Sequence, residues 1–270
     1  MVVTDSQVER WLREDLGHHD VTNDVPGETT GRLVAKDTGT VAGLDAAEAV
    51  FRYLDVTVTD RRENGERVEA GEPVLRVEGP ARAVLRAERV AVNLVSHASG
   101  IATRTHEAVA AARAERDDVR VAGTRKTTPG LRGIEKRAIV AGGGDTHRLT
   151  LSHMVIVKDN QVAELGLDDA VSRARERASF ATKIEVEVET PADGRRAAEC
   201  GADIVLFDNL SPEEVESGVE VLPEGVLAEA SGGITIAEVP AYARTGVDVV
   251  SLGSLTHSAP ALDLSFRTGE

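Results

Sequence analysis

The sequence predicts an α/β protein in which a small α+β unit precedes a parallel β-sheet. The first observation is a regular alternation of six apolar, strand-like runs with helix-like segments from residue 119 onward. Repeated βα units of this spacing form parallel sheets with right-handed crossovers, either open or closed into a barrel. The second is the length of 270 residues, 41% of them hydrophobic. That is enough for a barrel of about 170 residues and a smaller companion.

The N-terminal part has the pattern of the α+β unit. Residues 5–16 predict an amphipathic helix, with Asp5 or Ser6 as its N-cap and Gly17 after its end. Further on, short strands are expected at 31–37, 55–60 and 73–79, and a helix at 42–54. Residues 81–114 predict a long helical stretch that is interrupted near Ser99-Gly100.

The C-terminal part supplies the parallel sheet. Its strands are expected at 119–124, 153–158, 183–189, 203–208, 226–231 and 247–253. Helices are expected between them at 130–141, 168–178, 191–200, 211–219 and 235–244. Every one of these strands finishes in polar or glycine residues. Because ligands of parallel α/β folds bind at the carboxyl ends of the strands, the six strand ends predict one binding site.

Composition and charge exclude several classes of protein. The net charge of −15 argues against nucleic acid or an anionic membrane as the partner. No apolar run approaches the ~18 residues of a membrane span, and the N-terminus lacks the layout of a signal peptide. The single cysteine, Cys200, cannot form an internal disulfide. A reducing cytoplasm is therefore the expected location.

The basic residues are strongly skewed toward arginine, with only five lysines among the 31 Lys and Arg. An excess of carboxylates with few lysines is typical of halophilic proteins, in which a salty cytoplasm screens the repulsion. A codon bias that favours arginine is the alternative. In either case the remaining lysines are informative, because a chain that uses arginine almost everywhere keeps lysine where the chemistry of lysine matters.

Basic residues gather in the window 125–148, which carries a net charge of +4 while the rest of the chain carries −19. Arg125, Lys126 and Arg148 lie beyond strand ends or in loops, where Arg and Lys bind carboxylates or phosphates. A solvated helix face explains Arg132, Lys136 and Arg137 equally well. Lys158 follows the next strand. The flexible run Gly142-Gly143-Gly144 is placed to deliver His147 and Arg148.

Acidic and glycine residues complete the predicted site. In the strand KIEVEVE, the side chains of Glu185, Glu187 and Glu189 share one face, and Asp208 ends an apolar strand. Glu187 and Asp208 have the chemistry to bind Mg²⁺ that carries phosphate oxygens, or ribose hydroxyls, with an ion pair to Lys126 or Lys158 as the alternative. The glycines of Ser231-Gly232-Gly233, which we expect to open a helix, and of Gly253-Ser254 expose backbone N–H groups for phosphate.

Seven motifs, in order along the chain, resemble the quinolinate phosphoribosyltransferase family. They are TRKTTPGLRGIEKRAIVAGGGDTHR, VIVKDN, EVEVET, DIVLFDN, EASGGIT, GVDVVSLGSLTHSAPALDLS and, upstream, ERVAVNLVSHASGIAT. The resemblance covers nearly the whole chain. It implies an incomplete α/β barrel and an N-terminal α/β sandwich that the C-terminal tail completes. The implied domains are 1–105, 106–256 and, for the tail, 257–270.

The resemblance also implies the roles of the site residues. The two carboxylates of quinolinate would be bound by Arg125, His147, Arg148 and Lys158, with Arg89 from the partner of a homodimer or higher assembly. Phosphoribosyl pyrophosphate and Mg²⁺ would be bound by Thr124, Lys126, Glu187, Asp208, Ser231, Gly232, Gly233, Leu252, Gly253 and Ser254. Of these, Lys126, Lys158, Glu187 and Asp208 would be catalytic. Gly123, Gln161 and Ser254 depart from residues common in the family, but none of them is a charged site residue.

The implied activity is transfer of phosphoribosyl to quinolinate with decarboxylation, giving nicotinate mononucleotide in NAD biosynthesis. Three alternatives stay open. A molybdenum-operon homologue shares the scaffold but would lack part of the Arg/Lys set that is present here. A non-catalytic barrel that senses phosphorylated metabolites would not need Glu187 and Asp208. A Schiff-base enzyme would use Lys158 as its nucleophile.

Overall fold

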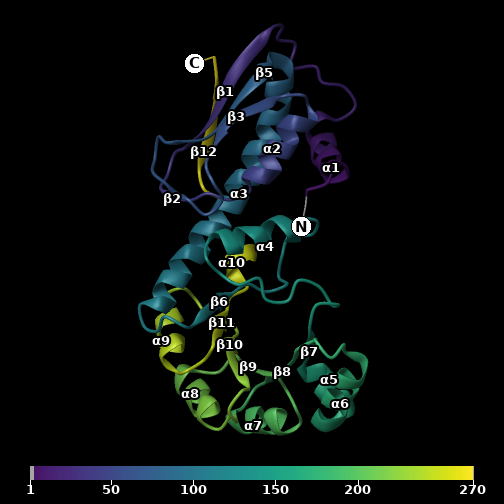
Figure 1. The fold of residues 1–270 in the computed structure, drawn as a ribbon, viewed down its shortest axis with the longest axis vertical. Helices are drawn as coiled ribbons and strands as arrows, with labels where there is room; N and C mark the ends of the chain where they lie inside the picture. Colours follow the sequence, from purple (N-terminus) through teal and green to yellow (C-terminus); the bar gives the residue numbers. More distant parts are fainter. Residues whose placement is uncertain (1–2, 270) are drawn as a thin grey trace. The chain divides into compact units, whose positions relative to one another are not determined.

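The computed structural model describes residues 3–269, which form two compact units (Figure 1). The second unit takes in residues 107–127 and 144–257, and the first contains the remainder, including 128–143. Segment 128–143 therefore departs from the continuous barrel domain expected at 106–256. The reason is that Ile134, Ala138 and Ile139 of α4 (Arg132–Ala141) are buried in the core of the first unit.

The first unit is built around an antiparallel sheet with the strand order β12-β1-β5-β3. Its strands are β1 (Glu28–Ala35), β3 (Thr57–Arg61), β5 (Pro73–Pro80) and β12 (Leu264–Thr268), beside a ribbon of β2 (Gly39–Thr40) and β4 (Arg67–Val68). Its helices are α1 (Asp5–Leu16), α2 (Leu44–Tyr53), α4 and most of α3 (Ala81–Arg113), whose last residues from 107 onward belong to the second unit. Because β12 is the C-terminal tail, its pairing with β1 confirms that the tail completes this unit.

Two details of the helices differ from the prediction. The N-cap of α1 is Thr4, whose N–H donates to Gln7 Oε1 at 3.1 Å, so the expected caps Asp5 and Ser6 were wrong. The helix α3 runs without interruption through Ser99 and Gly100. Ser99 Oγ donates to the Ala42 carbonyl and accepts from its N–H, and a side chain at Gly100 would collide with the carbonyl of Pro260. These small residues serve close packing and do not break the helix.

The second unit is a six-stranded parallel sheet with the order β6-β11-β10-β9-β8-β7. Its strands are β6 (Arg120–Ala122), β7 (Val155–Val157), β8 (Ile184–Val188), β9 (Ile204–Asp208), β10 (Leu227–Ser231) and β11 (Val249–Ser251). Its helices are α5 (Asp159–Leu165), α6 (Leu167–Arg177), α7 (Pro191–Glu199), α8 (Pro212–Glu220), α9 (Val239–Arg244) and α10 (Ser254–His257). The edge strands β6 and β7 do not pair with each other within residues 3–269, which gives the expected interrupted barrel.

The core of this unit lies between one face of the sheet and its helices. Val186, Val205 and Phe207 are completely buried there. The Phe207 ring approaches Gly194 of α7 and Gly218 of α8 closely, because these helices carry no side chain at the contact. Within the part of the chain that the structure describes, no helix is long and apolar enough to cross a membrane.

Candidate active site

The sheet of the second unit places its charged residues on the face opposite the apolar core. In β8 the side chains alternate, so Ile184, Val186 and Val188 enter the core while Glu185 and Glu187 lie on the other face. The strand register sets Glu187 level with Leu206 of β9 and Leu206 level with Glu229 of β10. Glu229 thus belongs to the charged face, although it is not among the predicted site residues. The sequence feature that could have revealed it is a single acidic residue in the apolar strand VLAEAS.

Lys158, Glu187 and Asp208 form a charged group at the carboxyl end of the sheet. Lys158 follows β7 and pairs with Glu187 of β8, which is the ion pair left open as an alternative. Partial burial raises the pKa of Asp208, as does the charge of Glu187, while Lys158 and Lys126 lower it. Asn209 Nδ2 donates to the Asp208 carboxylate at 2.6 Å. Because the carboxylates of Glu187 and Asp208 interact with each other, they favour a ligand that is cationic or carries hydroxyl groups.

Lys126 and the glycine loops lie along the same edge. The Thr256 hydroxyl donates to the Lys126 carbonyl at 2.7 Å, and the Lys126 side chain passes Gly253, where a Cβ would lie 2.9 Å from its Cδ. Gly232 has a φ of 100° and packs against Asn209 so closely that no other residue fits. The predicted helix start at 235 was wrong, because α9 begins only at Val239 after a turn in which Glu238 accepts from the Thr235 N–H.

Arg125 and Arg148 form a pair of guanidinium groups on this edge. Arg148 is only 9% exposed, and burial together with the charge of Arg125 lowers its pKa. The Nε atoms of both arginines are buried and lack a hydrogen-bond partner among residues 3–269. Since buried N–H groups are ordinarily paired, two adjacent cations with free donors define a site for an anion.

His147 precedes Arg148 in the chain, and its ring lies between two buried glutamates. Its Nε2 is 2.9 Å from Glu229 Oε2 and 3.3 Å from Glu185 Oε2. Burial lowers the pKa of His147, but the hydrogen bonds and charges of the two carboxylates outweigh it and raise the pKa to about 10. Burial and the charge of Glu229 raise the pKa of Glu185, whereas His147 and Arg148 lower it. Among the described residues, this is also the one group with the side chains and spacing to hold a metal ion.

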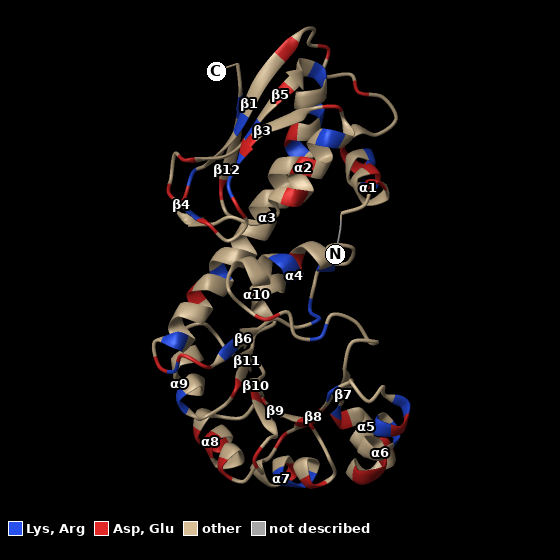
Figure 2. Ribbon diagram, in the orientation of Figure 1, with Lys and Arg blue, Asp and Glu red and all other residues tan. Residues whose placement is uncertain are grey.

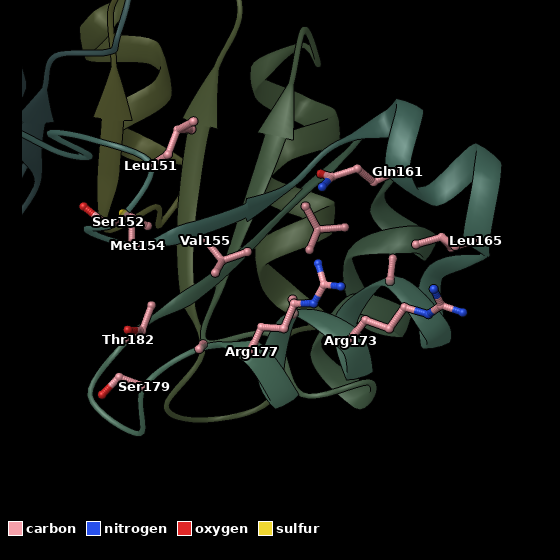
Figure 3. Close-up of a pocket in the computed structure, with 14 residues that line it drawn as sticks. Leu151, Ser152, Met154, Val155, Gln161, Leu165, Arg173, Arg177, Ser179 and Thr182 are labelled. Atoms are coloured by element: carbon pink, nitrogen blue, oxygen red, sulfur yellow. The ribbon is translucent and has the colours of Figure 1, made fainter.

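Two further features bear on the assignment of the site. Arg89 is on α3 of the first unit, with its side chain 61% exposed. A cavity of about 510 Å³ lies beside β7 and α6 and is lined partly by Leu151, Met154, Arg173 and Arg177 (Figure 3). None of the predicted site residues lines this cavity. We therefore assign the chemistry to the strand ends.

An interrupted parallel barrel with buried arginine Nε groups, neighbouring carboxylates and glycine loops at its carboxyl edge is typical of enzymes that act on phosphorylated or carboxylated small molecules. Comparison with known proteins makes the class specific. The family models of the N-terminal and C-terminal domains of quinolinate phosphoribosyl transferase match residues 19–99 and 101–267. The chain belongs to the quinolinate phosphoribosyltransferase family.

Named relatives match over nearly their whole length. The chain is 43% identical over 270 residues to the probable nicotinate-nucleotide pyrophosphorylase (carboxylating) of Methanothermobacter thermautotrophicus, covering 96% of this chain and 97% of the relative. It is 42% identical to the human nicotinate-nucleotide pyrophosphorylase (carboxylating), covering 96% and 90%. The crystal structure of NadC from Streptococcus pyogenes superimposes with a TM-score of 0.91 at 36% identity, covering 100% of this chain and 99% of that one.

Proposed function

We propose that this chain transfers phosphoribosyl from phosphoribosyl pyrophosphate to quinolinate. The products are nicotinate mononucleotide, CO₂ and pyrophosphate, in de novo NAD biosynthesis. Membership of the family and relatives above 40% identity support the assignment. The structural observation that carries it is the Arg125–Arg148 pair, whose buried donors match a ligand with two adjacent carboxylates.

Quinolinate is assigned to the cationic half of the edge. Arg125 and Arg148 would each bind a carboxylate, and His147 and Lys158 would supply further positive charge. Because a dianion must lose its hydration to bind, fixed cations are needed to offset that cost. A ligand with only one negative charge would leave one of these fixed cations unpaired. The site therefore also selects a doubly charged ligand over a singly charged one.

Phosphoribosyl pyrophosphate is assigned to the carboxylate and glycine half. Lys126, held by Thr256 and Gly253, would bind the pyrophosphate, and Glu187 and Asp208 would bind the ribose hydroxyls. The remaining contacts would come from Thr124 and from the backbone of Ser231, Gly232, Gly233, Leu252, Gly253 and Ser254. Thr124 Oγ1 accepts the Lys126 N–H at 3.1 Å, which fixes the start of this loop.

The carboxylates of Glu187 and Asp208 fit Mg²⁺ held largely through substrate and water, because they are hard oxygen ligands beside a proposed polyphosphate site. Bound Mg²⁺ would neutralise charge on the departing pyrophosphate. Chelation with EDTA should abolish turnover, and added MgCl₂ should restore it. Full activity in EDTA would contradict the proposed requirement.

The residues then support the two steps of the reaction. The quinolinate nitrogen attacks the ribose C1 as pyrophosphate leaves, and Glu187 and Asp208 stabilise the positive charge that develops on the ribose. The new pyridinium ring accepts the electron pair of the C2–carboxylate bond, CO₂ departs, and a proton replaces it at C2. Lys158 and the arginines hold the ring in place for both steps.

The proposal includes a homodimer or higher assembly, in which Arg89 reaches the active site of the partner. Its support is that Arg89 is exposed and lies in the unit that holds none of the other site residues. Arg89→Ala and Lys126→Ala proteins, each inactive alone, should regain activity when they are dissociated and reassociated together. No recovery would indicate that Arg89 serves its own subunit.

A Schiff-base enzyme is the alternative from another class. The ion pair of Lys158 with Glu187 disfavours it, because an ammonium in an ion pair is not the free amine that attacks a carbonyl. Borohydride should therefore trap no substrate adduct at Lys158.

A cytoplasmic location is part of the same proposal, supported by the single cysteine.

The experiment that tests the function is direct. The protein is incubated with quinolinate, phosphoribosyl pyrophosphate and Mg²⁺, and the products are separated by chromatography. Nicotinate mononucleotide is expected. A barrel that only senses phosphorylated metabolites would bind phosphoribosyl pyrophosphate without forming any product.

A further inference from the structure

Glu185 and Glu229, the two buried carboxylates beside His147, have no role in the mechanism above. Glu185 and Glu229 are 0% and 1% exposed. Both oxygens of Glu185 and Oε1 of Glu229 lack a hydrogen-bond partner among residues 3–269. Carboxylate oxygens left without a hydrogen bond are costly in a protein interior. Because Glu185 interacts with Arg148 of the proposed dianion site, this pair would also repel the substrate unless a cation compensates for it.

The cations that face these carboxylates come from one loop. His147 Nε2 lies between Glu229 Oε2 and Glu185 Oε2, and Arg148 attracts Glu185. On its own loop, His147 donates its backbone N–H to Asp145 Oδ1 at 2.8 Å, and Asp145 pairs with Arg120 at 3.3 Å. With an imidazolium at His147, two cations balance the two glutamates. With a neutral imidazole, the buried group keeps one negative charge.

The backbone of the loop that carries His147 is also fixed by its surroundings. His147 has a φ of 51°, the left-handed region that a residue with a side chain adopts only when its surroundings fix it. The Asp145 hydrogen bond fixes the loop from the backbone side and Glu229 fixes it from the ring side. Both glutamates face Nε2, so the Nδ1–H of an imidazolium remains for a ligand. The next residue in the chain is Arg148.

We propose that Glu185 and Glu229 are positioning residues that hold His147 as an imidazolium in the dicarboxylate site, next to Arg148. This inference rests on the proposed function. The carboxylates set both the orientation of the ring and its charge, and they thereby fix the turn that presents Arg148. Quinolinate binding should then stay insensitive to pH well above the range in which an unperturbed histidine loses its proton.

Glu229→Gln is the test variant, because it keeps the shape of the side chain and removes its charge. Its control is Glu216→Gln, which makes the same change at an exposed position of α8. The KM of each substrate is measured between pH 6 and 9. For the wild type and the control, the quinolinate KM should stay nearly constant. For Glu229→Gln it should rise roughly tenfold above pH 7, because a histidine that has lost the nearer of its two carboxylate partners becomes neutral at lower pH. The KM for phosphoribosyl pyrophosphate should not change.

Further measurements separate the possible outcomes. In the double variant His147→Gln, Glu229→Gln, the quinolinate KM should be high at every pH, which would assign the titration to His147. The ¹⁵N spectrum of His147 in the wild type at pH 8.5 should be that of an imidazolium, and this reading does not depend on turnover. If the wild type forms no nicotinate mononucleotide, the proposed function fails, whereas the spectrum still tests His147.

Three results would overturn the inference. One is a Glu229→Gln protein in which the KM values of both substrates rise equally at all pH values, as a merely structural defect would produce. Another is a neutral imidazole at pH 8.5 in the wild type. The third is one equivalent of divalent metal that survives dialysis of the wild type and is lost in Glu229→Gln, since the three side chains would then be metal ligands.

Discussion

At the scale of single residues, the account depends on the two arginines of the carboxylate site. Their Nε groups are buried and lack partners within residues 3–269, so we expect a ligand oxygen to complete each of them. Arg148→Ala should lower kcat/KM for quinolinate by more than a hundredfold, because removing one partner of a buried charge pair costs about 3–5 kcal/mol. Steady-state kinetics measures this. The matched control Arg173→Ala, at the cavity beside β7, should lose less than twofold.

The same pair predicts strong discrimination between substrates. Nicotinate lacks the 2-carboxylate, so its binding would leave one buried guanidinium without a partner. We expect its use to be more than a hundredfold weaker than that of quinolinate, from the same penalty of about 3–5 kcal/mol. Competition between the two acids in one reaction measures the ratio. Comparable use of both would show that the arginines do not each bind a carboxylate.

At the scale of elements, the packing of α7 and α8 on the sheet depends on glycine. A Cβ at Gly218 would lie 2.5 Å from the buried Phe207 ring. Gly218→Ala should destabilise the protein by about 1–3 kcal/mol through overpacking, even though alanine favours helices. Thermal unfolding measures the change, and Ser217→Ala on the exposed face of α8 is the control. A Gly218→Ala protein as stable as the control would mean that the ring has room to move.

Much of the element pattern could be predicted from the sequence because βα repeats have strong periodicity. The six strands follow from apolar runs and turns, whereas the return of the tail was implied only by the family resemblance. The interruption expected near Ser99-Gly100 was wrong because both residues serve contacts with segments far away in the sequence, at Ala42 and Pro260. The assignment of residues 128–143 to the barrel was wrong for the same reason. Ile139 is buried by residues of the first unit that lie far away in the sequence.

The candidate site shows the same limit. Lys158, Glu187 and Asp208 could be placed together because parallel strands end at one edge, and the structure brings them together. Glu229 was missed because one acid in an apolar strand does not reveal its partner. That partner, His147, lies 82 residues away in the sequence. Only the strand register places the two side chains on one face.

At the scale of the whole molecule, acidic residues are spread over helices of both units (Figure 2). The net charge of −19 outside 125–148 predicts strong self-repulsion at low salt. The screening length is roughly 30 Å at 0.01 M and about 3 Å at 1 M. The Tm should therefore climb between low and molar KCl, while the quinolinate KM rises only modestly, because close, buried pairs are screened less. A Tm that stays flat or falls would contradict halophilic adaptation and would indicate that the acidic excess arose from drift in amino-acid composition.

The central claim is that one site couples phosphoribosyl transfer to loss of the 2-carboxylate. The most direct measurement uses quinolinate labelled with ¹⁴C in that carboxylate and follows labelled CO₂ and nicotinate mononucleotide in one reaction. We expect equal amounts of the two products, and no CO₂ when phosphoribosyl pyrophosphate is left out. Release of CO₂ without phosphoribosyl pyrophosphate, or no nicotinate mononucleotide in the complete mixture, would contradict the account.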